Sequence, residues 1–224
     1  MREWLSLLGH TPANKKGERW YERDAGAERL AHDRWLLAGK YPSLKYALNF
    51  QTFKAVLQGE IVLREENSGI PTPIKVKVLF PDDYADSEPI AMDDGNNFAH
   101  IADRHFHPSG ACCLWLPIES QWNKKDENTL LNFVDQLAIF YERQLIYDSC
   151  GYWVWGERGH GEKGFIEYFG ELLGGDSKTV EAFLPVLSSD TSISNKAKCP
   201  CGSNRNYSLC HKQKVEFIKN SFKN

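Results

Sequence analysis

The sequence lacks any apolar run long enough to cross a membrane. No run approaches the roughly 18 residues that a spanning helix needs, and the opening Met1-Arg2-Glu3-Trp4 has neither the basic flank nor the long apolar stretch of a signal peptide. Internal repeats are also absent from the sequence. Of its 224 residues, 42% are hydrophobic and 12% aromatic, enough to build one sizeable domain with a small appendage. We therefore expect a cytoplasmic protein with no membrane association.

Cysteine is also scarce, at six residues in the whole chain. Three of them lie close together near the C-terminus, which leaves Cys112, Cys113 and Cys150 as an odd and clustered set. Reduced thiols explain such a set better than a disulfide framework does. Cys150 stands at the end of an expected long helix, where we predict a core residue rather than a reactive one.

The C-terminal cysteines have the spacing of a metal site. Cys199 and Cys201 are followed, after eight residues, by the adjacent Cys210 and His211. Thiolates and imidazole suit the tetrahedral preference of zinc, and the intervening Gly-Ser-Asn turn lets both pairs reach one ion. The alternative is four unrelated reduced side chains in a tail. The segment closely resembles the SEC-C motif, and we predict that these four residues bind one structural zinc ion.

Charge is distributed unevenly along the chain. The net charge is −3, yet residues 195–224 carry seven basic side chains against Glu216 alone, which gives +6 there and −9 elsewhere. A Ser-rich stretch without periodicity precedes this basic segment and predicts a linker. We therefore predict a main domain with a helical extension at 1–187, a linker at 188–197 and a zinc motif at 198–224. The basic segment could hold nucleic acid or an acidic protein surface, dock on its own body, or simply be solvated.

Two stretches have helical periodicity. The first carries apolar residues at helical spacing and is followed by Gly39 and Pro42, which predict its end. Its apolar positions are Ala27, Leu30, Ala31, Trp35 and Ala38. The second begins at Thr129 and predicts a long helix with one apolar stripe, formed by Leu130, Val134, Leu137, Tyr141 and Leu145.

Strand patterns lie between the two predicted helices. Ile74, Val76, Val78 and Phe80 alternate with lysines, a period of two that predicts a strand with one wet face. Residues 50–57 and 60–64 are expected partner strands, separated by a turn at Gly59. The order of helix, strands, irregular loop with cysteines and helix predicts an α+β fold with an antiparallel sheet.

Short motifs occur in a fixed order after the strands. Phe80-Pro81-Asp82-Asp83-Tyr84 comes first and Glu88-Pro89 follows; His107-Pro108-Ser109 then precedes Gly110-Ala111-Cys112-Cys113-Leu114, and Trp122 stands before the second helix. Over roughly residues 27–150, the element order and these motifs resemble the ubiquitin-conjugating enzyme fold. That family has a Phe-Pro-x-x-Tyr turn, a His-Pro-Asn tripeptide, in which Ser109 here replaces the Asn, and a Gly-x-x-Cys-Leu segment that carries the nucleophile. With the zinc motif and the segment from His160 to Gly164, the chain looks most like bacterial members found in antiphage defence operons, including those called CBASS.

The resemblance implies a catalytic role for Cys113, with His107 in the tripeptide. Cys113 would carry the C-terminus of a ubiquitin-like modifier, or of a partner such as a nucleotide-cyclising enzyme, as a thioester and pass it to a target lysine. Whether an activating enzyme must supply the acyl group stays open. Cysteine suits this relay because one thioester exchanges with another at little energetic cost and still reacts with amines. Neighbours in an extended segment point to opposite faces, so we expect one of the two cysteines to be exposed and the other buried. The register of the motif selects Cys113 as the exposed one, and the reverse assignment is the alternative. His105 and His107 would suit bracing of the loop at least as well as proton transfer. The role of His160 stays open.

Three functions remain open from the sequence. The first is the thioester-forming enzyme, which the position of Cys113 favours. The second is a catalytically silent relative that binds a modifier or partner without chemistry. The third is a nucleic-acid-binding zinc protein, which the acidic body disfavours because it supplies no broad basic face.

Overall fold

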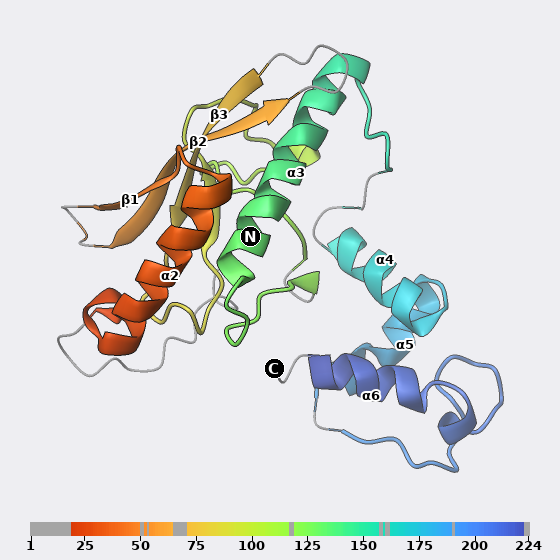
Figure 1. Cartoon of the computed structure of the whole chain (residues 1–224). Coiled ribbons are helices and arrows are strands. Elements are labelled where there is room, and N and C mark those ends of the chain that lie inside the picture. Colours follow the sequence, from red (N-terminus) through yellow and green to blue (C-terminus); the bar gives the residue numbers. More distant parts are fainter. Residues whose placement is uncertain are drawn as a thin grey trace. The chain divides into compact units, whose positions relative to one another are not determined.

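The computed structural model describes residues 19–49, 52, 54–64, 71–116, 119–156, 159, 162–189 and 191–221 (Figure 1). The chain divides into two compact units, which we call the first and second unit. The first comprises Met1–Leu114 and Gln121–Val154, and the second comprises Trp115–Ser120 and Trp155–Asn224. The division after Val154 differs from the expected linker at 188–197. The helices between Val154 and residue 188 therefore lie in the same unit as the C-terminal cysteines.

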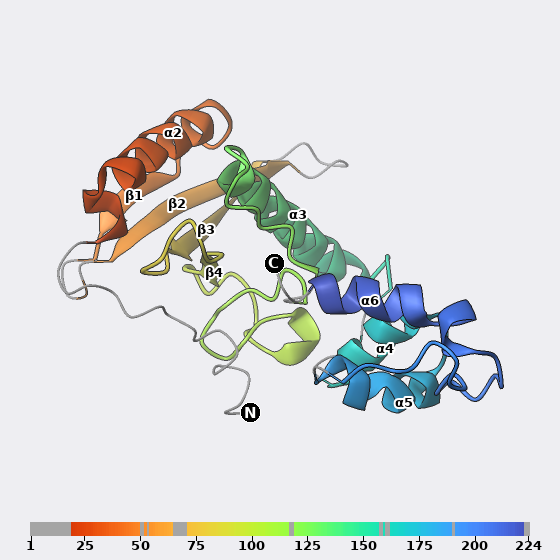
Figure 2. The same ribbon diagram turned by 90° about the horizontal axis from the view of Figure 1, so that it is seen from below.

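A four-stranded antiparallel sheet and two helices build the first unit. The strands lie in chain order, β1 (Lys45–Leu48), β2 (Ala55–Arg64), β3 (Pro71–Leu79) and β4 (Ile90–Asp93). Helix α2 (Asp24–Lys40) precedes the sheet, and α3 (Thr129–Cys150) follows the long loop after β4 and contacts both α2 and β2 (Figure 2). Short 3-10 turns stand before α2 and after β4, η1 (Trp20–Glu22) and η2 (Ala102–Arg104). The predicted α+β class with an antiparallel sheet is confirmed.

The register of the sheet confirms one strand prediction and corrects another. In β3, the predicted apolar positions are buried and Lys75 is exposed. β2, however, runs without interruption through Gly59, which pairs with Val76, so the predicted turn there is wrong. A Cβ at Gly59 would lie 2.1 Å from the backbone oxygen of Ser43, and its φ is +146°. The glycine therefore permits a close approach between β2 and the backbone that immediately precedes β1. Phe50, at the start of an expected strand, lies outside the described residues, and β1 was not predicted.

Helix α2 forms as predicted but buries a different face. Trp35 is 72% exposed, whereas Asp33 and Leu37 are buried. The carboxylate of Asp33 accepts hydrogen bonds from the hydroxyl of Tyr84 at 2.7 Å and from Nε of Arg29 at 2.9 Å. A buried carboxylate requires such partners, and desolvation nevertheless raises its pKa. The apolar pattern missed this face because a polar residue lies at its centre.

Helix α3 follows its predicted pattern closely. It ends at Gly151, whose φ of 79° is left-handed and whose amide donates to the carbonyl of Tyr147. Cys150 in the last turn is exposed, contrary to the expected core position, and its thiol donates to the carbonyl of Ile146 at 2.9 Å. Neither α3 nor any other helix in the described residues is long and apolar enough to cross a membrane. The predicted stripe is buried at Leu130, Val134, Leu137 and Tyr141.

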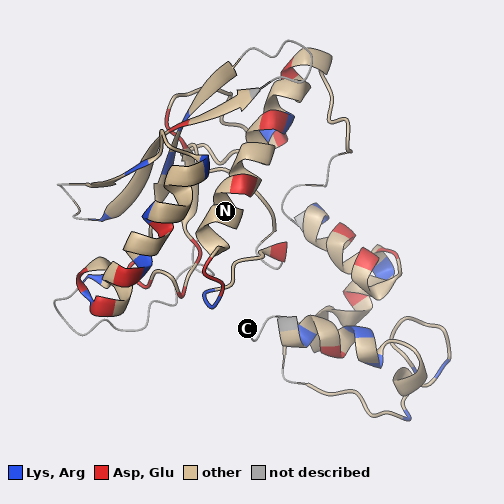
Figure 3. Cartoon of the chain, in the orientation of Figure 1, with Lys and Arg blue, Asp and Glu red and all other residues tan. Residues whose placement is uncertain are grey.

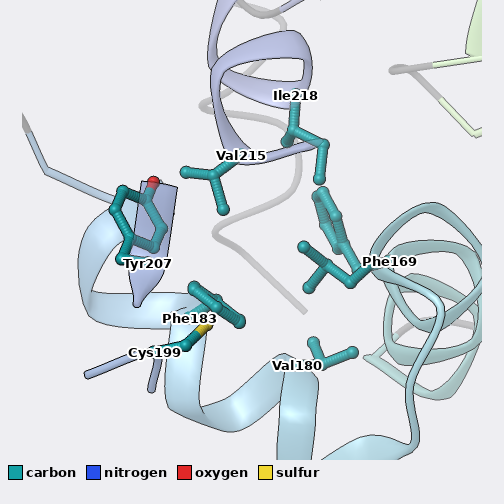
Figure 4. Packing of buried hydrophobic residues seen from close by; sticks show 8 residues of the cluster. Phe169, Val180, Phe183, Cys199, Tyr207, Val215 and Ile218 are labelled. Atoms are coloured by element: carbon teal, nitrogen blue, oxygen red, sulfur yellow. The ribbon is translucent and has the colours of Figure 1, made fainter. Parts of the chain in front are cut away.

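The second unit contains three helices and the stretch that carries Cys199, Cys201 and Cys210, which we call the cysteine segment. Its elements are α4 (Glu162–Leu173), α5 (Ser177–Leu187), η4 (Tyr207–Leu209) and α6 (Lys212–Ser221). Ile193, within the expected linker, packs against the core of this unit, and the amide of Tyr207 donates to the carbonyl of Ala197. The apolar faces of α4 and α5 are thus covered by the segment that was expected to be separate. The core, shown in Figure 4, contains Phe169, Leu173, Val180, Phe183, Cys199, Tyr207, Val215 and Ile218.

Charges balance within the second unit. Its sequence carries ten basic and nine acidic side chains, and Figure 3 shows both signs on its helices. Lys214 of α6 donates to the carbonyl of Leu173 at the end of α4, where a helix terminus favours a cation. The basic C-terminal segment therefore docks on helices of its own chain, one of the alternatives that the sequence left open.

Candidate functional site

Residues 105–113, which we call the cysteine loop, form a small hairpin beside β4. An antiparallel bridge pairs Phe106 with Cys112, and a second bridge joins the same strand segment to β4. The amide of Cys112 donates to a carbonyl of β4 at 2.9 Å, and the amide of Cys113 donates to the carbonyl of His105 at 2.8 Å. The two cysteines therefore lie in an extended segment that is hydrogen-bonded along both edges.

The adjacent cysteines have different surroundings. Sγ of Cys112 lies 3.5 Å from the hydroxyl oxygen of the fully buried Tyr141, and Cys112 is partly rather than fully buried. Cys113 is exposed, as expected. Burial raises the pKa of Cys112 to about 12. Partial desolvation of the sulfur also raises the pKa of Cys113, although the residue as a whole is exposed. Cys113 is thus the accessible thiol of the pair, and both thiols are largely protonated at neutral pH.

His107 lies at the turn of the cysteine loop. Its carbonyl accepts the amide of Gly110 at 2.8 Å. Its Nδ1 accepts the amide of Ser109 at 3.2 Å and lies 2.8 Å from the Ser109 hydroxyl oxygen. His107 itself is exposed. These contacts brace the turn, which was one of its two expected roles, while its assignment as catalytic stays a prediction.

A buried carboxylate braces the loop from the β4 side. The side chain of Asp93, the last residue of β4, is fully buried and its Oδ2 lies 2.9 Å from Nε2 of His100. The amide of Asp93 donates to the carbonyl of Gly110, whose φ is +88°. A Cβ at Gly110 would lie 2.9 Å from Cε1 of the His100 ring. Sequence reasoning missed this pair, although a carboxylate on the apolar face of a strand was its signal.

Arg104 and Gln144 form a second brace that the sequence analysis missed. Nε of Arg104 donates to Oε1 of Gln144 at 2.8 Å, and Nε2 of Gln144 donates to the carbonyl of Arg104 at the same distance. The guanidinium also lies over the ring of Tyr147, 4.7 Å from its centroid. Gln144 is fully buried on α3. A polar residue on the apolar stripe, three positions after Tyr141, was the available signal.

The Phe-Pro-x-x-Tyr segment packs as an aromatic cluster. The ring centroid of Tyr84 lies 4.7 Å from those of both Phe80 and Trp20. Nε1 of Trp122 donates to the carbonyl of Ala85 at 3.0 Å. The cluster and this hydrogen bond therefore tie the segment after β3 to the residues that precede α3.

The four predicted metal ligands come together in the second unit. Their ligand atoms all lie within 4.8 Å of one another. Sulfurs of Cys201 and Cys210 are 3.7 Å apart, and Nδ1 of His211 lies 3.3 Å from Sγ of Cys199 and 3.2 Å from Sγ of Cys210. A tetrahedral site with metal–sulfur bonds of about 2.3 Å has sulfurs about 3.8 Å apart. The cluster thus has the donors and the spacing to bind a metal ion.

The surroundings of the cluster prepare His211 as a ligand. Its Nε2 lies 3.1 Å from the carbonyl oxygen of Leu173, so the ring donates there and turns the lone pair of Nδ1 toward the sulfurs. Burial lowers the pKa of His211, which favours the neutral, metal-binding imidazole. Burial alone would raise the pKa of Cys201, but hydrogen bonds from the hydroxyl and backbone of Ser203 lower it to about 7. By contrast, burial raises the pKa of Cys199 to about 11.

Two further histidines were singled out from the sequence. His105 has a left-handed backbone, with φ of 55°, and its ring lies 5.2 Å from that of Trp153. Its carbonyl is the acceptor for the Cys113 amide. His160 lies outside the described residues.

Comparisons with known proteins add little to this geometry. No protein-family model and no curated protein matches the chain. Among solved structures, the chain is similar to the yeast Vps23 UEV domain, crystallised in complex with a Vps27 PSDP peptide. The two share 20% sequence identity over 52% of this chain and 81% of that one, with a TM-score of 0.39. At this level, the similarity assigns neither a family nor an activity.

Proposed function

We propose that the chain is a conjugating-type acyl carrier in which Cys113 bears a thioester. The observation that carries this proposal is the arrangement of two adjacent cysteines. Cys113 is exposed in a segment hydrogen-bonded along both edges, whereas the sulfur of Cys112 faces Tyr141. The element order also supports it, since a helix, a four-stranded meander, a cysteine loop and a long helix occur as the sequence resemblance implies.

The chemistry requires two exchanges at one carbonyl carbon. The thiolate of Cys113 attacks an incoming thioester, forms a new carbon–sulfur bond, and releases the donor as a thiolate. The neutral amine of a target lysine then attacks, an amide bond forms, and Cys113 leaves as a thiolate while the amine proton passes to solvent. The acyl group would be the C-terminus of a ubiquitin-like modifier or of a partner such as a nucleotide-cyclising enzyme, supplied with or without an activating enzyme.

One observation favours a second candidate, a binding module without chemistry. Desolvation raises the pKa of both loop thiols, and thioester exchange needs the thiolate. The side chain of Ser109, where the family has an amide, lies against Nδ1 of His107. Under this candidate, the fold would hold a partner and Cys113 would be dispensable.

A chemical donor distinguishes the two candidates without identifying the natural partner. The full chain is mixed with a synthetic peptide that ends in a glycyl thioester, and the adduct is measured by intact mass and peptide mapping. The carrier predicts a reductant-sensitive adduct on Cys113 that Cys113→Ser removes and Cys112→Ser largely retains. An adduct distributed equally over Cys112, Cys113 and the exposed Cys150 would sink the carrier proposal and favour the binding module.

We assign zinc as the metal of the second unit. Three thiolates and one imidazole at tetrahedral spacing are the donors that zinc prefers, and four protein ligands leave no open position for catalytic water. The ion would therefore hold Cys199, Cys201, Cys210 and His211 together in a structural role. Metal analysis of the purified full chain should find about one zinc per chain, and its loss from a Cys199→Ser, Cys210→Ser double variant would locate it.

The setting in bacterial antiphage defence rests on the sequence resemblance alone. A neighbouring gene for an activating enzyme, a deconjugating protease or a nucleotide cyclase would support it. The nucleic-acid alternative is weakened by the near balance of ten basic and nine acidic side chains in the second unit.

A further inference from the structure

We propose that Arg104 and Gln144 form a clamp that positions Cys113 by fixing the backbone of His105. The buried side-chain amide of Gln144 on α3 binds the guanidinium and the carbonyl of Arg104. The next residue, His105, binds the Cys113 amide through its carbonyl. The effect on acyl transfer rests on the proposed function, whereas the effect on the thiol itself does not.

The α3 end of the clamp is fixed by reciprocal hydrogen bonds. Gln144 has no exposed surface. Its side chain both accepts from Nε of Arg104 and donates to the Arg104 carbonyl, each at 2.8 Å, and Nη2 of Arg104 reaches the Gln144 carbonyl at 3.3 Å. Nη1 of Arg104 pairs with the exposed Asp148. The planar guanidinium provides all of these donors in one rigid group, which a lysine could not reproduce.

The loop end of the clamp begins at the next residue. His105 has φ of 55° and ψ of 36°, a left-handed conformation that few residues with a Cβ adopt without support. Its amide donates to the carbonyl of Ala102 at 2.7 Å and its carbonyl accepts the Cys113 amide at 2.8 Å. The Arg104 carbonyl belongs to the same peptide group as the His105 amide. Holding that carbonyl with Gln144 therefore holds the plane that begins this left-handed turn.

The position of Cys113 follows from the turn. Its amide points to His105, while the preceding amide, that of Cys112, points to β4. The same extended backbone places the two cysteine side chains on opposite faces of the segment. Release of His105 would free one edge of the segment. Cys112 would then lose its inward orientation toward Tyr141, and Cys113 would lose its fixed outward one.

Loss of the clamp should have two opposite effects, faster alkylation of the thiols and slower acyl transfer to Cys113. Without the clamp, both thiols gain solvent, so a small alkylating reagent should modify them faster. If the pKa of a thiol falls by about one pH unit, about tenfold more of it is thiolate at neutral pH. Because that thiolate is less nucleophilic, the alkylation rate rises only about threefold. Acyl transfer to Cys113 should slow at the same time because the attacking geometry is lost. General destabilisation would not raise thiol reactivity while leaving the fold intact.

The test compares variants of the full chain by iodoacetamide alkylation, with each cysteine followed by peptide mass spectrometry across pH. Gln144→Leu fills the buried site but removes both amide contacts, and Arg104→Lys keeps the charge without the fork. Both should increase alkylation of Cys112 and Cys113 about threefold and move the pH profile of Cys113 downward. Gln144→Glu keeps the acceptor for Arg104 and should restore part of the wild-type profile. Asp148→Asn, which changes only the exposed partner, is the matched control and should behave as wild type.

Circular dichroism and melting of each variant establish that it is folded. If Gln144→Leu does not fold, Arg104→Lys carries the test because its site is at the edge of the core. Wild-type alkylation profiles in both folded variants would overturn the clamp, as would an effect of Asp148→Asn equal to theirs. A wild-type chain that accepts no glycyl thioester would count against the proposed function, but the alkylation result would still decide the clamp.

Discussion

The two units of the chain solve the problem of burial in different ways. The first unit places a four-stranded sheet against α2 and α3, and its core includes long apolar stripes from strands and helix alike. The second has an eight-residue core in which one member, Cys199, is also a predicted metal ligand. Small cores supply little stability alone, so metals or disulfides commonly supplement them. We therefore expect the first unit to be held by packing alone and the second by packing together with a bound metal.

Removal of metal should therefore unfold the second unit and leave the first unit folded, which is the largest effect on stability that we expect. A structural zinc site contributes about 10–16 kcal/mol in small zinc domains. Because His211 is bonded to α4 through Leu173 and its ring lies 5.0 Å from that of Phe183 in α5, chelation should unfold α4, α5 and α6 together. Hydrogen exchange with mass spectrometry should show loss of protection in these helices while α3 and the sheet keep theirs.

The control for this experiment is Cys150→Ser, which removes an exposed thiol outside the metal cluster. It should retain metal and protection in both units. Loss of protection in residues 198–221 alone, with α4 and α5 intact, would show that the cysteine segment is an independent appendage, as the sequence had suggested.

A core truncation in the first unit should give the converse result. Leu137 is fully buried on α3, so Leu137→Ala should lower the free energy of unfolding by about 2–5 kcal/mol through lost burial and the cavity left behind. Urea unfolding followed by tryptophan fluorescence would measure it. The metal content and the exchange protection of α4–α6 should be unchanged. Ile139→Ala, at a partly exposed position two residues away, is the matched control with a smaller expected loss.

Features that depend on residues close together in the sequence were the easiest to predict. The four predicted metal ligands lie within thirteen residues, so their spacing was enough to predict that they come together. The helix at 129–150 and the alternation in β3 were equally legible because periodicity is a local property. The opposite orientation of Cys112 and Cys113 followed from the geometry of any extended segment.

Contacts between distant residues account for what the sequence did not reveal. Asp33 is buried because Tyr84, 51 positions later, supplies a hydrogen bond. Arg104 and Gln144 are 40 positions apart. Gly59 indicated a turn, yet its role is to admit the backbone of Ser43. In each case, the residue type was visible but its partner was not, and the partner decides whether a polar or small residue lies inside.

The buried Asp33 makes the stability of the first unit depend on pH. Desolvation raises its folded-state pKa above the ordinary value of about 3.9, so the folded chain binds this proton more tightly than the unfolded chain. Relative to Asp33→Asn, the wild type should gain stability as pH falls from the raised pKa to about 3.9, by about 1.4 kcal/mol for each pH unit that separates the folded and unfolded pKa values. Urea unfolding of both proteins across this range would measure the difference.

Tyr84→Phe provides the complementary variant for this pH dependence. It removes a hydrogen bond to the ionised carboxylate, which should cost about 1–3 kcal/mol near neutral pH, and the cost should shrink once Asp33 is protonated. If the wild type instead gained stability over Asp33→Asn as pH rises through this range, Asp33 would be stabilised in its charged form and the expected sign would be wrong.

The smallest effect is expected at the start of α5 in the second unit. Asp176 caps this helix by accepting the amide of Thr179 at 3.0 Å, and this hydrogen bond lowers its pKa. A lowered pKa means that the contribution is present above the ordinary value and is lost as pH falls through the folded one. Asp176→Ala should therefore speed exchange of the first amides of α5 at neutral pH, whereas Asp176→Asn should retain most protection because its side-chain oxygen still accepts. If the chain binds metal as proposed, the change should stay within α5, because the metal would hold the rest of the unit. Release of the metal, or faster exchange in α4 and α6, would contradict this expectation. The second unit would then depend on its helix cap for most of its stability, and the metal site would depend on the helices as much as the helices depend on the metal.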